Sequence, residues 1–240
     1  MISSSLAKIS GRSERRAPAT LEIDVIADFI CPWCYMGKRR LDQALVAVHG
    51  PRQVSWYPFQ LNPEMPESGM AVEEYLRSKF GDPEALQPGM RELERVGREL
   101  GIEFRFDKLR RVPNTLNAHR VMKLAETEGA DTSLLAERLM RAFFGQGRDI
   151  SDPGVLAECV EPLGLVADDV HRTLQDELSR RVVLAQEAQV RKGGVTGVPD
   201  FLVNKRLFVV GAQSTAALVT VFDRVMFGED SDLPVSETLH

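Results

Sequence analysis

The sequence has 240 residues, of which 43% are hydrophobic and 27% charged, a balance that is ordinary for a soluble chain with one large domain. A net charge of −5 argues against nucleic acid and anionic membrane surfaces as main partners. Three cysteines are too few for a secreted disulfide scaffold.

The N-terminal segment, residues 1–20, is polar and rich in Ser and Arg. It lacks the apolar core of about seven residues that a secretory signal needs, so we interpret it as a disordered tail. The sequence also has no run of about eighteen apolar residues, so we expect no transmembrane helix. The expected location is therefore the cytoplasm.

The first half of a sheet follows this tail. Residues 21–29 alternate in polarity and predict a strand, and the amphipathic run 35–48 predicts a helix that ends near Gly50 and Pro51. Residues 54–61 predict a second strand, and a right-handed crossover would make the two strands parallel. Pro58 within that strand indicates a sheet edge or a bulge.

From residue 71 to 194 the signals are helical, apart from a short extended piece at 102–106. The last section predicts a hairpin of 200–203 and 206–210, then a helix that Ser214 caps and Gly228 ends. The order is β-α-β, a large all-helical insertion, then α-β-β-α, which is an α/β fold. We expect sheet-domain parts at 21–66 and 178–228, an insertion at 67–177, and a mobile tail at 229–240.

Two thiols, Cys31 and Cys34, stand at the junction of the first predicted strand and helix. This spacing at such a junction is typical of reversible disulfide chemistry. Pro32 suits the first helical position, which would make Cys31 the N-cap, where the helix dipole lowers the pKa of a thiol. We therefore predict Cys31 as the attacking thiol and Cys34 as the resolving one.

Two other interpretations of the pair are weaker. A structural zinc site needs two more ligands, and the sequence offers only Cys159 and four scattered histidines, so we expect no metal. A permanent structural disulfide would close a very small loop and gain little. Cys159 lies on the apolar stripe of a predicted helix, together with Leu156, Val160 and Leu163, so we interpret it as a buried, inert thiol.

The whole pattern resembles a thioredoxin fold with a helical insertion, as in the DsbA family and, within it, the FrnE-like branch. The fragments that carry the resemblance are Asp28-Phe29-Ile30-Cys31-Pro32-Trp33-Cys34, Phe59-Gln60-Leu61-Asn62-Pro63, Pro113-Asn114-Thr115-Leu116-Asn117-Ala118-His119 and Gly197-Val198-Pro199. The resemblance implies a thiol–disulfide oxidoreductase that needs no cofactor beyond its redox-active Cys31–Cys34 disulfide. It also implies a cis Val198–Pro199 bond that faces the disulfide and exposes backbone to a substrate peptide.

The sequence departs from the family pattern in two places. Val25 stands six residues before Cys31, where related proteins often carry a buried acid, so we propose Asp28 as a substitute proton relay, with helix capping as the equal alternative. Trp33 replaces the histidine of the DsbA motif, so Cys31 should be less acidic than the DsbA thiol. The redox direction therefore cannot be copied from DsbA.

The remaining candidate residues concern substrate binding. We expect substrate to contact the residues around the cysteine pair, namely Pro32, Trp33, Val198, Pro199, Phe59, Asn114 and Asn117. Helix capping explains Asn114 equally well. We interpret His119 as a packed histidine rather than a catalytic base.

The expected partners are thiol or disulfide substrate proteins, or glutathione as a co-substrate, and the oligomeric state stays open. The rival function is a glutathione-dependent isomerase or transferase, of the 2-hydroxychromene-2-carboxylate isomerase or kappa-class type. Such enzymes use a single Ser or Cys, so Cys34 argues against them. A binding module that has lost catalysis is the third alternative, which the intact cysteine pair disfavours.

Overall fold

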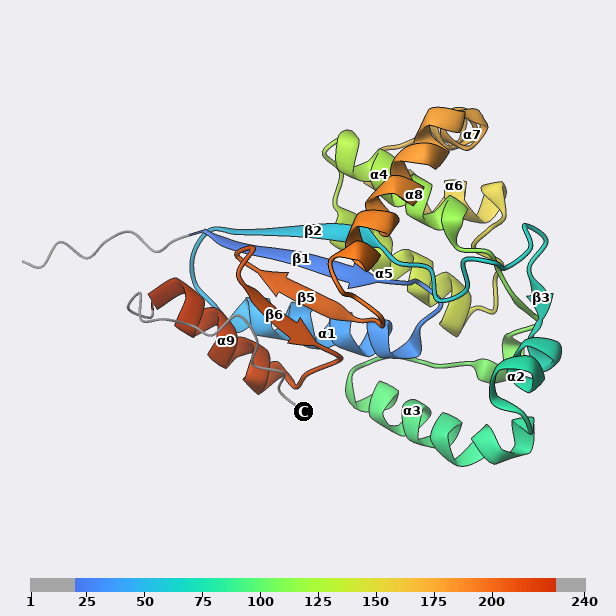
Figure 1. Ribbon diagram of the computed structural model, residues 1–240, viewed down its shortest axis with the longest axis horizontal. Coiled ribbons are helices and arrows are strands. Elements are labelled where there is room, and N and C mark those ends of the chain that lie inside the picture. The colour runs from blue at the N-terminus through green and yellow to red at the C-terminus, as the bar shows by residue number, and fades with distance from the viewer. Residues whose placement is uncertain (1–19, 228–240) are drawn as a thin grey trace, which may run out of the picture.

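A mixed four-stranded sheet forms the centre of the molecule (Figure 1). The computed structural model describes residues 20–227, so the expected tails lie, apart from residue 20, outside the described residues. The strands are β1 (Leu21–Ala27), β2 (Arg52–Pro58), β5 (Asp200–Val203) and β6 (Leu207–Val210), in the order β2-β1-β5-β6. The predicted parallel pairing of β1 with β2 is confirmed, and β5 runs antiparallel to both of its neighbours.

Two helices, α1 (Pro32–Ala47) and α9 (Thr215–Phe227), pack together against one face of this sheet. Phe201 and Phe222 are fully buried between the sheet and these helices. β2 is an edge strand, which explains why it tolerates Pro58 at its end. The α-β-β-α ending starts with the long helix α8 (Glu177–Lys192), which begins two residues earlier than expected because the Asp176 carboxylate caps it.

The segment between β2 and α8 contains the predicted helices. They are α2 (Val72–Phe80), α3 (Gln87–Glu99), α4 (Leu116–Thr127), α5 (Thr132–Met140), α6 (Pro153–Val160) and α7 (Ala167–Gln175). The extended piece expected at 102–106 is not a strand; its end joins a 3-10 turn, Phe106–Lys108. Two short strands, β3 (Met70–Ala71) and β4 (Arg111–Val112), pair here and were not predicted, because two residues carry no periodic signal.

The insertion is attached to α1 by a polar cluster around Glu137 of α5. Tyr35 and Arg39 each donate to Glu137 Oε1, at 2.6 and 2.7 Å, and the buried Lys38 ammonium lies 3.3 Å from its other oxygen. Because Glu137 is largely buried, these charge-assisted bonds are worth more than surface ion pairs. The cluster fixes the insertion next to the helix that carries the two cysteines.

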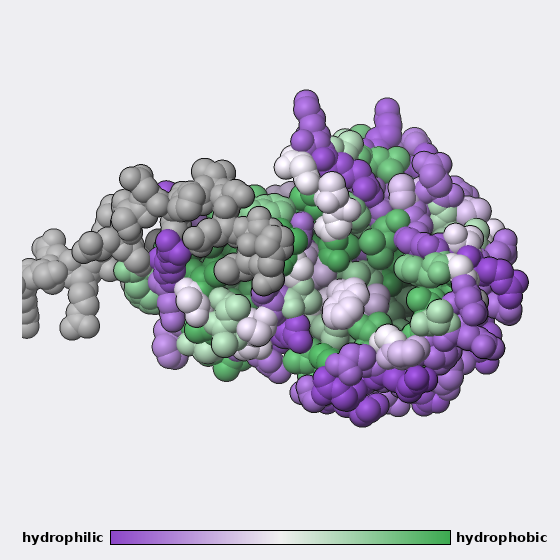
Figure 2. All heavy atoms as spheres, turned by 60° about the horizontal axis from the view of Figure 1, so that its bottom comes forward, coloured by the Kyte–Doolittle hydropathy of each residue, from purple (hydrophilic) through white to green (hydrophobic). Residues whose placement is uncertain are grey.

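Polar and apolar side chains are unevenly distributed over the surface of the molecule. Figure 2 shows a strongly hydrophilic rim on the side where Figure 1 places the charged helix α3. Apolar side chains surround a hollow behind that rim. The molecule therefore presents an apolar depression next to a charged border. No helix within residues 20–227 is long and apolar enough to cross a membrane.

Candidate active site

The two cysteines lie where β1 turns into α1, as predicted. Cys31 is the N-cap residue with an extended backbone, and Pro32 occupies the first helical turn. The Cys31 side chain accepts no capping hydrogen bond, but its backbone N–H donates to Asp28 O at 3.2 Å. Both cysteines are free thiols and almost fully buried, whereas Trp33 between them is 52% exposed. A tryptophan so placed offers substrate an apolar contact at the mouth of the pair.

The electrostatic surroundings of the Cys34 thiol favour its protonated form. Burial raises the pKa of the Cys34 thiol well above its usual value, and the hydrogen bond and charge of Cys31 raise it further. The Asp28 backbone lowers the pKa of Cys34, whereas the Asp28 charge raises it. Cys34 therefore holds its proton at neutral pH, and it can act as a nucleophile only if a neighbouring group takes that proton.

The Val198–Pro199 segment closes the site from the other end of the chain. This peptide bond is cis, and the Cys31 thiol lies 3.7 Å from Val198 O. Pro199 is buried against α1, where a Cβ atom on Gly37 would lie only 3.0 Å from Pro199 Cγ. Glycine at position 37 thus allows the helix with the cysteines to approach Pro199 closely.

Asp28 lies at the bottom of the site and is fully buried. Its Oδ2 accepts a hydrogen bond from Leu61 N at 2.8 Å, and its Oδ1 lies 3.6 Å from His119 Nε2. His119 is packed as expected, with its ring 4.8 Å from that of Phe29, but packing is not its only contact. Sequence reasoning missed the approach of His119 to Asp28, because nothing local connects β1 with α4.

Three of the predicted substrate contacts have other partners within the protein. Phe59 is only 2% exposed, and the Arg191 guanidinium covers its ring at 3.9 Å. Asn114 is engaged by Met65 O and Leu116 N, so its side chain fixes a loop and caps α4. Asn117 bonds weakly to Ser151 O and to Arg120. These three side chains therefore have structural contacts, although Asn114 and Asn117 are partly exposed, as Pro32 and Val198 are.

Comparison with known proteins places this chain in a family. A family model described as a DSBA-like thioredoxin domain matches residues 22–223, which is most of the chain. The chain belongs to the DSBA-like thioredoxin domain family. The predicted fold class and the predicted relationship to the DsbA family are thus confirmed.

Known proteins differ in how much they resemble this chain. A probable DsbA oxidoreductase from Streptomyces coelicolor is 28% identical, covers 89% of this chain and 92% of its own, and gives a TM-score of 0.78. Cytosolic disulfide reductase DsbM from Pseudomonas aeruginosa, solved with glutathione, is 19% identical over 85% of this chain and 95% of its own, with a TM-score of 0.58. The uncharacterised Bacillus subtilis protein YwbO is 25% identical over 77% of this chain and 87% of its own. The DsbM likeness shows a shared fold.

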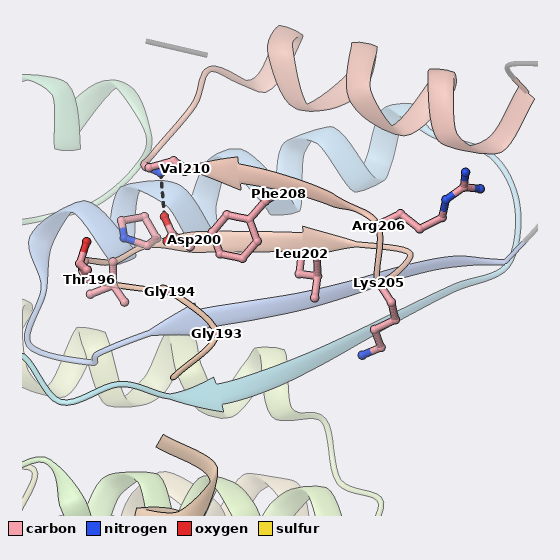
Figure 3. Close-up of a pocket in the computed structure, with 13 residues that line it drawn as sticks. Gly193, Gly194, Thr196, Asp200, Leu202, Lys205, Arg206, Phe208 and Val210 are labelled. Atoms are coloured by element: carbon pink, nitrogen blue, oxygen red, sulfur yellow. Dashed lines mark hydrogen bonds between the residues drawn. The ribbon is translucent and has the colours of Figure 1, made fainter. Parts of the chain in front are cut away.

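This DSBA-like domain also carries a groove of about 690 Å³ that the sequence did not predict (Figure 3). Leu202 and Phe208 project from β5 and β6 into its middle, and Lys205 and Arg206 stand at the hairpin end. Val198 and Pro199 form part of its lining, so the groove extends away from the cysteine pair. The alternation of β5 and β6 was the available signal, since Leu202 and Phe208 pair across the hairpin on one face.

Asp200, the residue after Pro199, is a buried acid in the lining of the groove. Burial raises its pKa from 3.8 to about 6, and a 3.2 Å hydrogen bond from Gly211 N partly opposes this shift. Because the folded state binds this proton more tightly than the unfolded chain, the contribution of Asp200 to stability is greatest below pH 3.8. That contribution is lost as the pH rises to about 6.

We expect Asp200→Asn to stabilise the protein at pH 7 by about 1–3 kcal/mol relative to its effect at pH 4. The amide keeps an oxygen for the Gly211 N–H but does not ionise. Urea unfolding of variant and wild type at both pH values measures the difference. Asp223→Asn, at an exposed position of α9, is the control that should show no such pH dependence. Parallel stability profiles for Asp200→Asn and wild type would contradict the prediction.

Proposed function

We propose that this protein is a thiol–disulfide oxidoreductase that exchanges disulfides with protein or small-thiol substrates through Cys31 and Cys34. One observation carries the proposal: the Cys31 thiol lies 3.7 Å from Val198 O, beside the cis Val198–Pro199 bond, and Cys34 lies one helical turn further along α1. The Cys31 sulfur thus faces the backbone segment at which a substrate peptide would pair, and the Cys34 sulfur is close enough to displace a substrate from it. Membership of the DSBA-like family supports the same chemistry.

The proposed reaction has two exchange steps. In the reductive direction, the Cys31 thiolate attacks a substrate disulfide, a mixed disulfide forms and one substrate thiolate leaves. Cys34 then attacks Cys31, the second substrate thiolate leaves and the Cys31–Cys34 disulfide remains. In the oxidative direction the same steps run backwards, starting from the disulfide. Asp28 is the proposed proton acceptor for Cys34, because its carboxylate is buried next to that thiol.

Several finer features belong to the proposal. We place the protein in the FrnE-like branch on its motifs and in the cytoplasm on its sequence. Glutathione is a candidate co-substrate, and its presence in the solved structure of DsbM, which shares the fold, supports this choice. Substrate would contact Trp33 and the Val198 backbone at the mouth of the site.

The rival proposal is a glutathione-dependent isomerase. A 2-hydroxychromene-2-carboxylate isomerase shares the fold, with a TM-score of 0.60 at 16% identity. Such an enzyme needs only one activated Ser or Cys, whereas this chain places two cysteines in contact. Cys34 therefore favours the oxidoreductase.

An equilibrium redox titration of the wild-type protein in glutathione buffers tests the proposal. Trp33 lies between the two cysteines and is half exposed, so its fluorescence should report formation of the disulfide. A midpoint near about −270 mV would indicate a reductant like thioredoxin, and one near about −120 mV an oxidant like DsbA. Cys34→Ser is the control that should show no such transition. If the wild type forms no intramolecular disulfide at any potential, the oxidoreductase proposal is wrong and the isomerase replaces it.

A further inference from the structure

The contact between Asp28 and His119 leaves two buried polar atoms without partners. Asp28 Oδ1 and His119 Nε2 face each other at 3.6 Å, and neither has a hydrogen-bond partner among residues 20–227. A buried polar atom without a hydrogen-bond partner destabilises the folded state, so two such atoms facing each other are unusual unless they share a proton. A single proton held between the carboxylate and the imidazole would satisfy both atoms.

The pair is also linked through the backbone to the segment that carries the thiols. The Asp28 carbonyl accepts a hydrogen bond from Cys31 N–H at 3.2 Å, so the turn that holds Asp28 also places the cysteine pair. Leu61 N fixes the other carboxylate oxygen at 2.8 Å, which directs Oδ1 toward His119. Burial and the neighbouring Cys31 are the main causes of the raised pKa of Cys34, and the charge of Asp28 is a further one. The Asp28 carboxylate is therefore within electrostatic reach of that thiol.

On its far side, His119 approaches the protein surface. It lines a small cavity with Trp56, Gln186 and Lys123, and the cavity volume of about 10 Å³ is close to the space of one water molecule. Trp56 Nε1 is another buried donor without a partner in the described part of the chain, and the Lys123 side chain is 35% exposed. His119 therefore lines the same small cavity as a side chain that reaches solvent.

We propose that His119 is a positioning residue for disulfide exchange, which shares with Asp28 the proton that Cys34 releases or takes up. This role rests on the proposed function and adds a second element, α4 of the insertion, to the chemistry of the sheet domain. The competing interpretation is that His119 is only a core ring packed on Phe29.

The step balances as follows. Starting from the mixed disulfide, the Cys34 thiol gives its proton to Asp28, where it is held between Oδ1 and Nε2. The Cys34 sulfur attacks the Cys31 sulfur, the Cys31–Cys34 bond forms and the bond from Cys31 to the substrate sulfur breaks. The substrate leaves as a thiolate and takes a proton from water. Over the full reaction the protein dithiol is oxidised to a disulfide, and the substrate disulfide is reduced to two thiols.

Stopped-flow fluorescence of the reduced protein mixed with oxidised glutathione separates the two steps. Formation of the mixed disulfide depends on glutathione concentration, whereas attack by Cys34 does not. We expect His119→Phe and Asp28→Asn each to slow the concentration-independent phase by about a hundredfold, as loss of acid–base assistance does. The concentration-dependent phase should stay within about twofold of wild type. The double variant should be no slower than the worse single variant, because both residues act on one proton.

Two further measurements separate this role from packing. His119→Gln keeps a donor for Asp28 Oδ1 but cannot carry the proton, so it should slow the same phase, whereas His171→Phe at an exposed position should change neither phase. In the wild type, the ¹⁵N chemical shift of His119 Nε2 should change between the dithiol and disulfide forms, a test that needs no variant. Equal slowing of both phases, or an unchanged Nε2 shift, would overturn the role of His119. If the wild type shows neither phase, the proposed exchange function is wrong. This outcome differs from one in which the wild type exchanges disulfides normally and the His119 variants do so at the same rate.

Discussion

Replacing Cys31 by serine is expected to reduce disulfide exchange to the uncatalysed background, a loss of at least about a thousandfold for removal of a nucleophile. A serine hydroxyl has the same position at the start of α1 but is not ionised at neutral pH and forms no disulfide. The assay is reduction of a protein disulfide in the presence of excess glutathione. Cys159→Ser is the matched control, since Cys159 is 4% exposed and burial raises its thiol pKa.

Cys34→Ser should behave differently from Cys31→Ser. It leaves the first attack intact and removes the second, so mixed disulfides between Cys31 and substrate should accumulate and be visible by mass spectrometry. Turnover at the wild-type rate in Cys34→Ser would show that one thiol suffices. Such a result would contradict the exchange mechanism and favour the glutathione-dependent rival.

The second large effect concerns stability. We expect Glu187→Ala to lower the free energy of unfolding by about 3 kcal/mol. Glu187 of α8 is 4% exposed and accepts hydrogen bonds from Gln60 N and Gln60 Nε2, at 2.8 and 2.7 Å. It also pairs with Arg191 at 2.7 Å. Alanine leaves the buried Gln60 donors without an acceptor, and urea unfolding followed by circular dichroism measures the loss.

The control for this prediction is an exposed pair of the same spacing. Glu73 and Arg77 form an i,i+4 ion pair in which both side chains are more than 60% exposed. Glu73→Ala should therefore change stability by less than about 0.5 kcal/mol. A Glu187→Ala effect no larger than that of the control would show that burial of the carboxylate does not hold α8 against the sheet domain.

Much of the architecture was predictable because its signals are local. Period-two and period-3.6 patterns, with Asp131, Asp152 and Pro153 as start signals, located most helices and strands. Pro32 predicted the helix start and therefore the N-cap position of Cys31. The parallel pairing of β1 and β2 followed from the handedness of crossovers rather than from any single residue.

The parts of the site that escaped prediction depend on contacts between distant segments. Phe59 lies at the end of a strand, and its neighbours in the sequence suit a residue of a groove as well as a residue of the core. The guanidinium of Arg191, from the distant helix α8, covers its ring, and this contact cannot be predicted from the residues around Phe59. His119 approaches Asp28 because α4 packs near β2, which no pattern in either segment reveals. The capping role of Asn114 could be predicted because capping is local. Its hydrogen bond to Met65 O could not, because Met65 is distant in the sequence.

The division of the active site between the two ends of the chain has a consequence for biosynthesis. The cysteines are on β1 and α1, whereas Val198 and the partner strand β5 follow after the whole insertion. Cys34 and Pro199 are 165 positions apart, and a ribosome adding about 5–20 residues per second needs roughly 8 to 33 seconds to make that stretch. During this interval the nascent chain exposes an unshielded dithiol to oxidants and metal ions. The cysteine pair therefore gains the cover of Val198, Pro199 and β5 only after the C-terminal hairpin has been made.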